Sequence, residues 1–110
     1  MNDRLLARQK DVQGRTRFYV LPIESEPGFQ DLIKFVSQDF GCQFGELDRG
    51  PGTLVQTGMV GGKALLFVQS DSTGTQFYAE DENDVGIAEQ VAKGVEARLL
   101  NRGQIRKLAL

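Results

Sequence analysis

The sequence contains no histidine, one cysteine and three prolines in 110 residues. The absence of histidine excludes Ser-His-Asp triads, Cys-His nucleophile pairs and most zinc or iron sites. The single cysteine, Cys42, has no partner for an intrachain disulfide and cannot build a thiolate metal cage. We therefore expect no cofactor and no bound metal, and we predict that the chain is not an enzyme.

Long hydrophobic runs are also missing. No apolar stretch approaches the roughly 20 residues needed to cross a bilayer, and the first residues lack the apolar core of a secretory signal. These absences, together with the lone cysteine, lead us to expect a cytoplasmic protein with no membrane contact. The length and the 40% hydrophobic and 25% charged content are those of one globular domain.

Charge is unevenly distributed along the chain. Residues 1–17 carry a net charge of +3 and residues 98–110 carry +4, whereas residues 18–97 carry −9. We interpret this as one domain over 1–110, with a basic N-terminal segment at 1–16 and a basic C-terminal tail at 103–110. The basic ends either lie against the acidic body or are solvated. The sequence pI of about 5.1 argues against nucleic-acid binding.

The first half of the chain has one well-marked helix. Residues 17–23 are β-rich and predict a strand. Ser25 to Gly28 is a typical helix start, and apolar residues then recur at helical spacing from Phe29 to Phe40. Gly41 is the expected C-terminal end of that helix. A short helix over residues 2–13 has only a weak signal.

The second half predicts strands followed by a helix. We expect strands at 42–47, 53–59, 63–70 and 75–80, with a loop at 48–52 and tight turns at 60–62 and 71–74. Residues 64–68 are apolar on both faces, so this strand is expected to be central, with helices on one side and a neighbour or partner on the other. A second helix is expected to begin at 81–84 and end at 101–103. Its Gly86 and Gly94 each lower the helix propensity by about 1 kcal/mol relative to alanine, and we expect them to permit close packing of the helix on the sheet.

These elements define an α+β fold class. The predicted architecture is a single antiparallel sheet of about five strands in the order β-α-β-β-β-β-α, with two main helices packed on one face. The segment from Gly58 to Lys63 has too few of the required residues for a phosphate loop and is interpreted as a hairpin turn. Cys42 is interpreted as a small apolar residue at a strand start.

Acidic residues cluster before the second predicted helix. Glu80, Asp81, Glu82 and Asp84 suit helix capping, and they lack the spaced ligands of a recognised calcium loop. Carboxylates at such a cluster also suit contact with a basic partner. The candidate partner-binding residues are Glu46, Asp48, Glu80, Asp81, Glu82 and Asp84.

With no catalytic constellation in view, we hypothesise a small protein-binding module. In size, charge and architecture it resembles the immunity proteins of bacterial toxin–immunity pairs, although no motif identifies a family. That resemblance implies an inhibitor whose acidic surface blocks the active site of a toxin, a nuclease being one such target. The alternatives are a secretion chaperone or adaptor, whose apolar sheet face binds a client and which forms a homodimer, and a small-ligand-binding domain.

Overall fold

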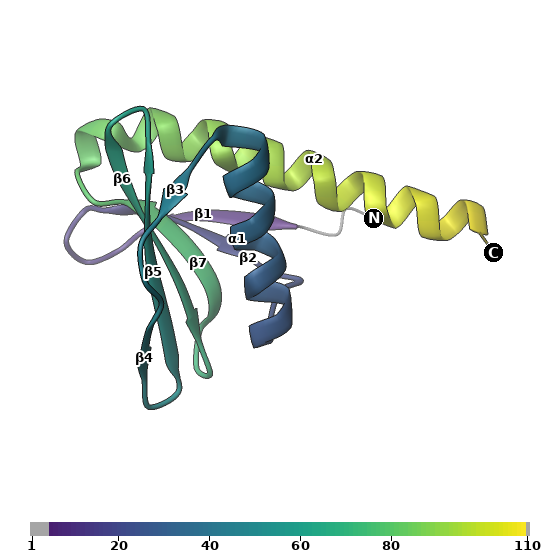
Figure 1. The fold of residues 1–110 in the computed structure, drawn as a ribbon, viewed down its shortest axis with the longest axis horizontal. Coiled ribbons are helices and arrows are strands. Elements are labelled where there is room, and N and C mark those ends of the chain that lie inside the picture. Colours follow the sequence, from purple (N-terminus) through teal and green to yellow (C-terminus); the bar gives the residue numbers. More distant parts are fainter. Residues whose placement is uncertain (1–4, 110) are drawn as a thin grey trace.

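The computed structural model describes the backbone of residues 5–109 and the side chains of residues 5–100. These residues form one antiparallel sheet of seven strands with two long helices (Figure 1). The strands are β1 (Leu6–Lys10), β2 (Thr16–Val20), β3 (Gln43–Phe44), β4 (Asp48–Gly50), β5 (Thr53–Val60), β6 (Lys63–Ser70) and β7 (Gly74–Ala79). The helices are α1 (Glu26–Phe40), the short 3-10 helix η1 (Glu82–Asp84) and α2 (Val85–Ala109).

The order of strands in the sheet is β1-β2-β7-β6-β5-β3, and β4 also pairs with β5. Every pairing is antiparallel. The α+β class and the antiparallel sheet are confirmed, and β6 is central as expected. The strand number of about five was too low, because β1 and β4 were not predicted.

The N-terminal residues form an edge strand, not the predicted short helix. β1 pairs with β2 along its whole length, from Leu6 opposite Val20 to Lys10 opposite Thr16. The side chain of Asp11 sets the turn between them, accepting hydrogen bonds from the backbone N–H groups of Gln13 and Arg15 at 2.9 and 3.0 Å. This local turn chemistry and the pairing with β2 override the weak helical pattern.

The stretch after α1 also differs from its prediction. A strand over 42–47 was expected, but β3 covers only Gln43–Phe44, and β4 falls at Asp48–Gly50, where a loop was expected. Both short strands pair with the long strand β5. A small segment of turn-forming residues can pair in this way because the partner strand supplies the hydrogen-bonding edge.

Helix α1 begins and ends where the sequence predicts. The hydroxyl of Ser25 caps its start, accepting from the N–H of Gly28 at 3.4 Å. Gly41 ends it in the left-handed conformation with φ 64°, which a glycine adopts at no steric cost. The buried side chains are Phe29, Leu32, Ile33, Phe35 and Val36.

Helix α2 is longer than predicted. It continues through 101–103 to Ala109, so the segment at 103–109 is helical and Gly103 is not a C-terminal cap. One glycine in a helix costs about 1 kcal/mol relative to alanine, which the good helix formers around it offset. In Figure 1 the C-terminal part of α2 runs on past the sheet and α1.

Both helices lie on one face of the sheet. α2 crosses β2 and β7, while α1 contacts α2, β3 and β6. Between these layers lies one core, in which the rings of Phe18, Phe77 and Phe67 stack across three neighbouring strands with centroids 5.4 and 5.2 Å apart. Within the described residues, no helix lies over the opposite face of the sheet.

Candidate functional site

Four of the acidic candidates lie in the connection from β7 to α2. Asp81 caps η1, its carboxylate accepting from the N–H of Asn83 at 3.0 Å. Asp84 forms an ion pair with Lys63 at 3.6 Å. Glu80 is exposed. The helix-capping role expected from the sequence is therefore present at Asp81.

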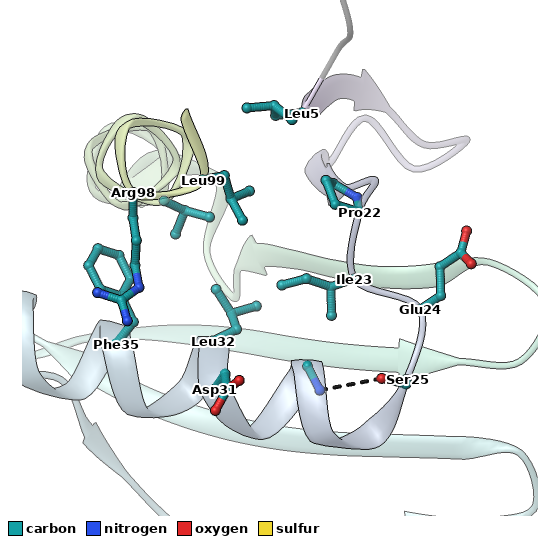
Figure 2. Close-up of a pocket in the computed structure, with 12 residues that line it drawn as sticks. Leu5, Pro22, Ile23, Glu24, Ser25, Asp31, Leu32, Phe35, Arg98 and Leu99 are labelled. Carbon is teal, nitrogen blue, oxygen red and sulfur yellow. Dashed lines mark hydrogen bonds between the residues drawn. The ribbon is translucent and has the colours of Figure 1, made fainter. Parts of the chain in front are cut away.

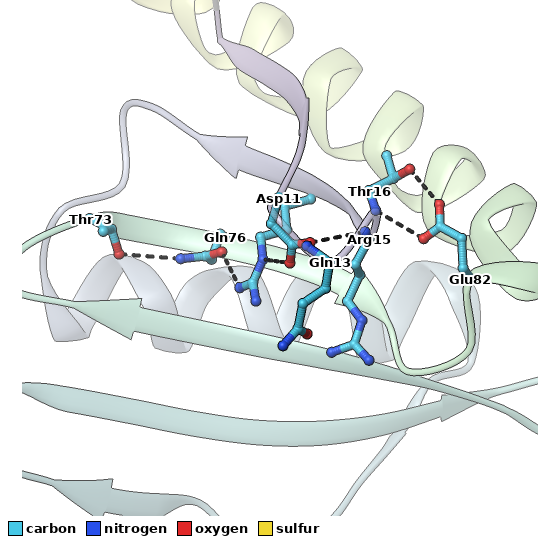
Figure 3. A network of polar contacts seen from close by, with 8 residues as sticks. Asp11, Gln13, Arg15, Thr16, Thr73, Gln76 and Glu82 are labelled. Atoms are coloured by element: carbon cyan, nitrogen blue, oxygen red, sulfur yellow. Dashed lines mark hydrogen bonds and ion pairs between the residues drawn. The ribbon is translucent and has the colours of Figure 1, made fainter.

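Glu82 ties this connection to the sheet. Its carboxylate accepts hydrogen bonds from the hydroxyl and the backbone N–H of Thr16, the latter at 2.9 Å (Figure 3). Thr16 is almost completely buried. These hydrogen bonds hold the pKa of Glu82 below its ordinary value. The carboxylate is thus already engaged within the fold.

The other two acidic candidates lie elsewhere. Asp48 pairs with Val55 on β5, which in turn pairs with Val68 on β6. The backbone N–H of Glu80 donates to the carbonyl oxygen of Ala64 on β6. Ala64 is four residues away from Val68 on the same strand. At about 3.3 Å per residue and about 4.8 Å per strand, Asp48 and Glu80 are roughly 20 Å apart. Glu46 lies just before Asp48. The structure therefore groups the acidic candidates at two places, and the acidic-inhibitor hypothesis stays a prediction.

A groove of about 330 Å³ lies between α1, α2 and the segment joining β2 to α1 (Figure 2). Its walls are largely apolar, formed by Leu5, Pro22, Ile23, Leu32, Phe35, Val95 and Leu99. The charged side chains at the groove are Glu24, Asp31 and Arg98. The Arg98 guanidinium stacks on the Phe35 ring, 4.8 Å from its centroid. The volume is at the lower end of the range of about 300–1,000 Å³ for small-molecule sites.

The side of the sheet opposite the helices is covered by no helix of the described residues. Side chains alternate along a strand, and residues paired across strands share a face. Leu65 and Phe67 point into the helix-covered core, so Leu66 and Val68 point away from it. We call this side the open face. Its residues, given by the register, are Ala7, Gln9, Arg17, Tyr19, Gln43, Asp48, Gly50, Thr53, Val55, Thr57, Met59, Ala64, Leu66, Val68, Ser70, Gly74, Gln76 and Tyr78.

The centre of the open face is apolar. Val55, Ala64, Leu66 and Val68 are all partly exposed, and Met59 is 42% exposed. They come from the two longest strands, β5 and β6, which pair along all eight residues. An antiparallel sheet with one solvated face normally has polar residues on that face. The centre of the open face departs from that pattern.

Arginines cover one flank of the open face. The guanidinium groups of Arg17 and Arg15 lie over the ring of Tyr78, 4.3 and 5.1 Å from its centroid. Arg17 also bonds Asp11 at 2.9 Å and Gln76 at 2.7 Å, and the bond from Arg17 helps to hold the pKa of Asp11 below its ordinary value. Tyr78 is consequently only 8% exposed.

The remaining sequence candidates have structural roles. Cys42 is 3% exposed, and burial raises the pKa of its thiol to about 11, as expected for a small apolar residue. The residues from Gly58 to Lys63 form the predicted β5–β6 hairpin, with Gly61 and Gly62 at positive φ. Among the described residues, no group of three or more His, Cys, Asp or Glu side chains is arranged to hold a metal ion.

The sequence alone did not identify the individual residues of the open face. Its signal in the sequence was the apolar character of residues 64–68 on both sides of the strand, from which a neighbour or partner was expected. The contributions of Val55, Met59 and Tyr19 depend on the register of β5 and β2 with their neighbours. Such register is set by tertiary pairing, which spacing along one chain does not reveal.

The chain matches no protein-family model, no curated protein and no solved structure. Within the described part of the chain, no helix is long and apolar enough to span a membrane. Neither result assigns a ligand or partner to the chain.

Proposed function

We propose that the chain is a protein-binding module that holds its partner against the open face of the sheet. The observation that carries this proposal is the uncovered apolar centre formed by Val55, Leu66 and Val68, with Met59 at its edge. Burial of such a surface releases about 25 cal/mol for each Å² of apolar area. The proposal corresponds to the adaptor or chaperone hypothesis, in which an apolar sheet face binds another protein.

The geometry favours the open face over an acidic inhibitory surface. An inhibitory surface that blocks a basic active site needs its carboxylates close together and free to face the partner. Here the carboxylate of Glu82 is hydrogen-bonded to Thr16, and the carboxylate of Asp84 forms an ion pair with Lys63. Glu46 and Asp48 lie on a different part of the sheet. The open face, by contrast, has its apolar side chains side by side on adjacent strands.

The experiment is affinity capture from the native cell with matched variants. Leu66→Asp and Val68→Asp each place an unpaired carboxylate in the apolar centre, so we expect at least about a 100-fold weaker complex. Leu100→Asp is the control, because Leu100 is an exposed leucine (51%) on α2, away from the sheet. The double variant Glu80→Lys/Asp81→Lys tests the acidic alternative.

A partner that wild type and Leu100→Asp capture, and that both open-face variants lose, supports the proposal. A partner that the open-face variants retain while Glu80→Lys/Asp81→Lys loses it contradicts the proposal and favours the acidic inhibitor. Circular dichroism on each purified variant confirms that loss of binding does not reflect loss of the fold.

A second candidate function is binding of a small apolar molecule in the groove beside Phe35. The apolar walls and the volume of about 330 Å³ support it. The test is a thermal-shift screen of apolar compounds against wild type and Leu99→Glu, because Leu99 is partly exposed at the groove wall. A stabilising compound whose effect disappears in Leu99→Glu supports this function, and stabilisation retained in the variant contradicts it.

A further inference from the structure

The open face has its chemistry arranged in bands along the strands. The apolar band runs over β5 and β6, where Val55 and Val68 are paired neighbours. On one side, β7 and β2 carry Tyr78, Tyr19 and Arg17. The charge of Arg17 is balanced by its ion pair with Asp11, and the cation that remains on this flank is Arg15, whose guanidinium lies over the Tyr78 ring. On the other side, the segment at 45–48 ends in the carboxylate of Asp48. A cationic flank and an anionic flank thus lie on opposite sides of an apolar centre.

The two flanks are equally distant from β6. β2 is two strands away through β7, and β4 is two strands away through β5. A two-fold axis between facing sheets and parallel to β6 would therefore place β2 over β4 of a second copy. Leu66 and Val68 would then meet the same residues of the second copy at the axis, and the Arg17 flank would face the 45–48 segment. Opposite charges would meet at both ends of the interface.

A two-fold axis perpendicular to the strands is less favourable. It would place β2 over β2 of the second copy and bring the Arg17 flank against itself. Like charges facing one another across an interface oppose association. The charge pattern therefore favours the axis parallel to β6 over the perpendicular one.

The face is also close in area to a dimer interface. From β2 to β4 the strands are five, six, eight, eight and three residues long, and at about 3.3 Å per residue and about 4.8 Å per strand they cover roughly 480 Å² as a flat area. Stable interfaces at the lower end of the standard range bury about 600 Å² of accessible surface on each partner. A corrugated surface of side chains has more accessible area than its flat projection, so the face approaches this size.

We infer that the partner on the open face is a second copy of this chain, in a two-fold dimer whose axis runs parallel to β6. The inference rests on the proposed function and names the occupant of the same surface. The two sheets pack face to face, about 10 Å apart, with the helices of both copies on the outside.

Two measurements on the purified protein test the dimer. Sedimentation equilibrium of wild type, Leu66→Asp and the control Leu100→Asp gives the mass of each in solution. We expect dimers for wild type and the control and a monomer for Leu66→Asp, whose dissociation constant rises at least about 100-fold.

The second measurement is cross-linking at the axis with a short bismaleimide. Val68→Cys is expected to give a covalent dimer, because the two copies of residue 68 face each other, and Leu100→Cys is expected to give none. The native Cys42 does not interfere, since its side chain is only 3% exposed. This measurement needs no disruptive variant, so it remains informative if Leu66→Asp fails to fold.

A monomeric wild type overturns the dimer inference, as does a dimer that Leu66→Asp leaves intact or that Val68→Cys does not cross-link. A different result would contradict the proposed function. If purified wild type is a monomer, yet a different protein is captured by wild type and lost by Leu66→Asp, then the open face binds a foreign partner and only the dimer inference is wrong. If the dimer forms through another surface and no capture depends on Leu66, both are wrong.

Discussion

The contact between α2 and α1 can be tested by replacing two glycines of α2 with alanine, Gly94 at the contact and Gly86 away from it. A Cβ atom added to Gly94 would lie 2.8 Å from Cε2 of Phe40 and still closer to the tip of the ring. At Gly86 a Cβ atom would meet nothing within 4 Å. The sequence suggested close packing of the helix on the sheet at both glycines. The structure shows a close contact at Gly94 alone, and its partner there is Phe40 of α1. Alanine should therefore have opposite effects at the two positions.

The magnitudes follow from known contributions. Replacing glycine by alanine in a helix stabilises by up to about 1 kcal/mol, and near the helix start at Gly86 we expect about 0.5 kcal/mol. At Gly94 the Phe40 ring must move away from its edge-on contact with Phe35, where the centroids are 6.2 Å apart. Overpacking of this kind costs about 1–3 kcal/mol, so the net effect is a destabilisation of about 1 kcal/mol.

The assay is thermal and urea unfolding of Gly94→Ala, Gly86→Ala and wild type. For a chain of this size, we expect Gly94→Ala to unfold about 4 °C below wild type and Gly86→Ala about 2 °C above it. In a Phe40→Ala background the ring is gone, so Gly94→Ala should become stabilising, with a coupling energy of about 2 kcal/mol. Equal stabilisation by both alanines in the wild-type background would refute the packing of Phe40 on Gly94.

Other residues give further predictions. Hydrogen bonds lower the pKa of Glu82 in the folded protein. The stabilisation they give is therefore present above the ordinary pKa of 4.5 and is lost as the pH falls through the pKa of the folded state. Thr16→Val should lower the free energy of unfolding by about 1 kcal/mol near neutral pH and weaken its dependence on acid pH, as measured by urea unfolding at several pH values. A steeper acid dependence in Thr16→Val would contradict this. The thiol of Cys42 should react with a disulfide reagent far more slowly in the folded protein than in urea, since it is buried with a pKa raised to about 11; equal rates would contradict its burial. Gly58→Ala should destabilise by about 1–3 kcal/mol, because its Cβ would lie 2.7 Å from Cε1 of Phe44, and a neutral result in urea unfolding would contradict this close contact.

Much of the fold could be predicted because its signals are local. The Ser25 cap, the apolar spacing of α1 and the terminal Gly41 lie within a few residues of the elements they define. The paired glycines Gly61 and Gly62 likewise mark the β5–β6 hairpin. Local signals of this kind survive folding when tertiary contacts agree with them.

The misassigned elements depend on contacts between distant residues. β1 forms because β2 offers it an edge, and β4 forms because β5 extends beyond the end of β3. Neither short segment has a strong pattern of its own. In α2, Gly103 carries the turn signal of a helix end, but the helix continues through it. One unfavourable residue does not end a helix when the residues on both sides support it.

The candidate site shows the same division. The acidic residues were identified from composition, but composition does not show that Glu82 bonds Thr16, distant in the sequence but adjacent in the fold. The open face joins residues of β2, β4, β5, β6 and β7, which only the register brings together. Its one sequence signal was the apolar strand at 64–68.

In the proposed function, protein covers the open face. The most direct measurement places a photo-crosslinking amino acid at residue 66, on the open face, or at residue 100, on the exposed side of α2, in the native cell. If protein covers the open face, residue 66 gives a discrete cross-linked product, with a second copy or another protein, and residue 100 gives none. No product from residue 66, or the same products from both positions, would contradict it.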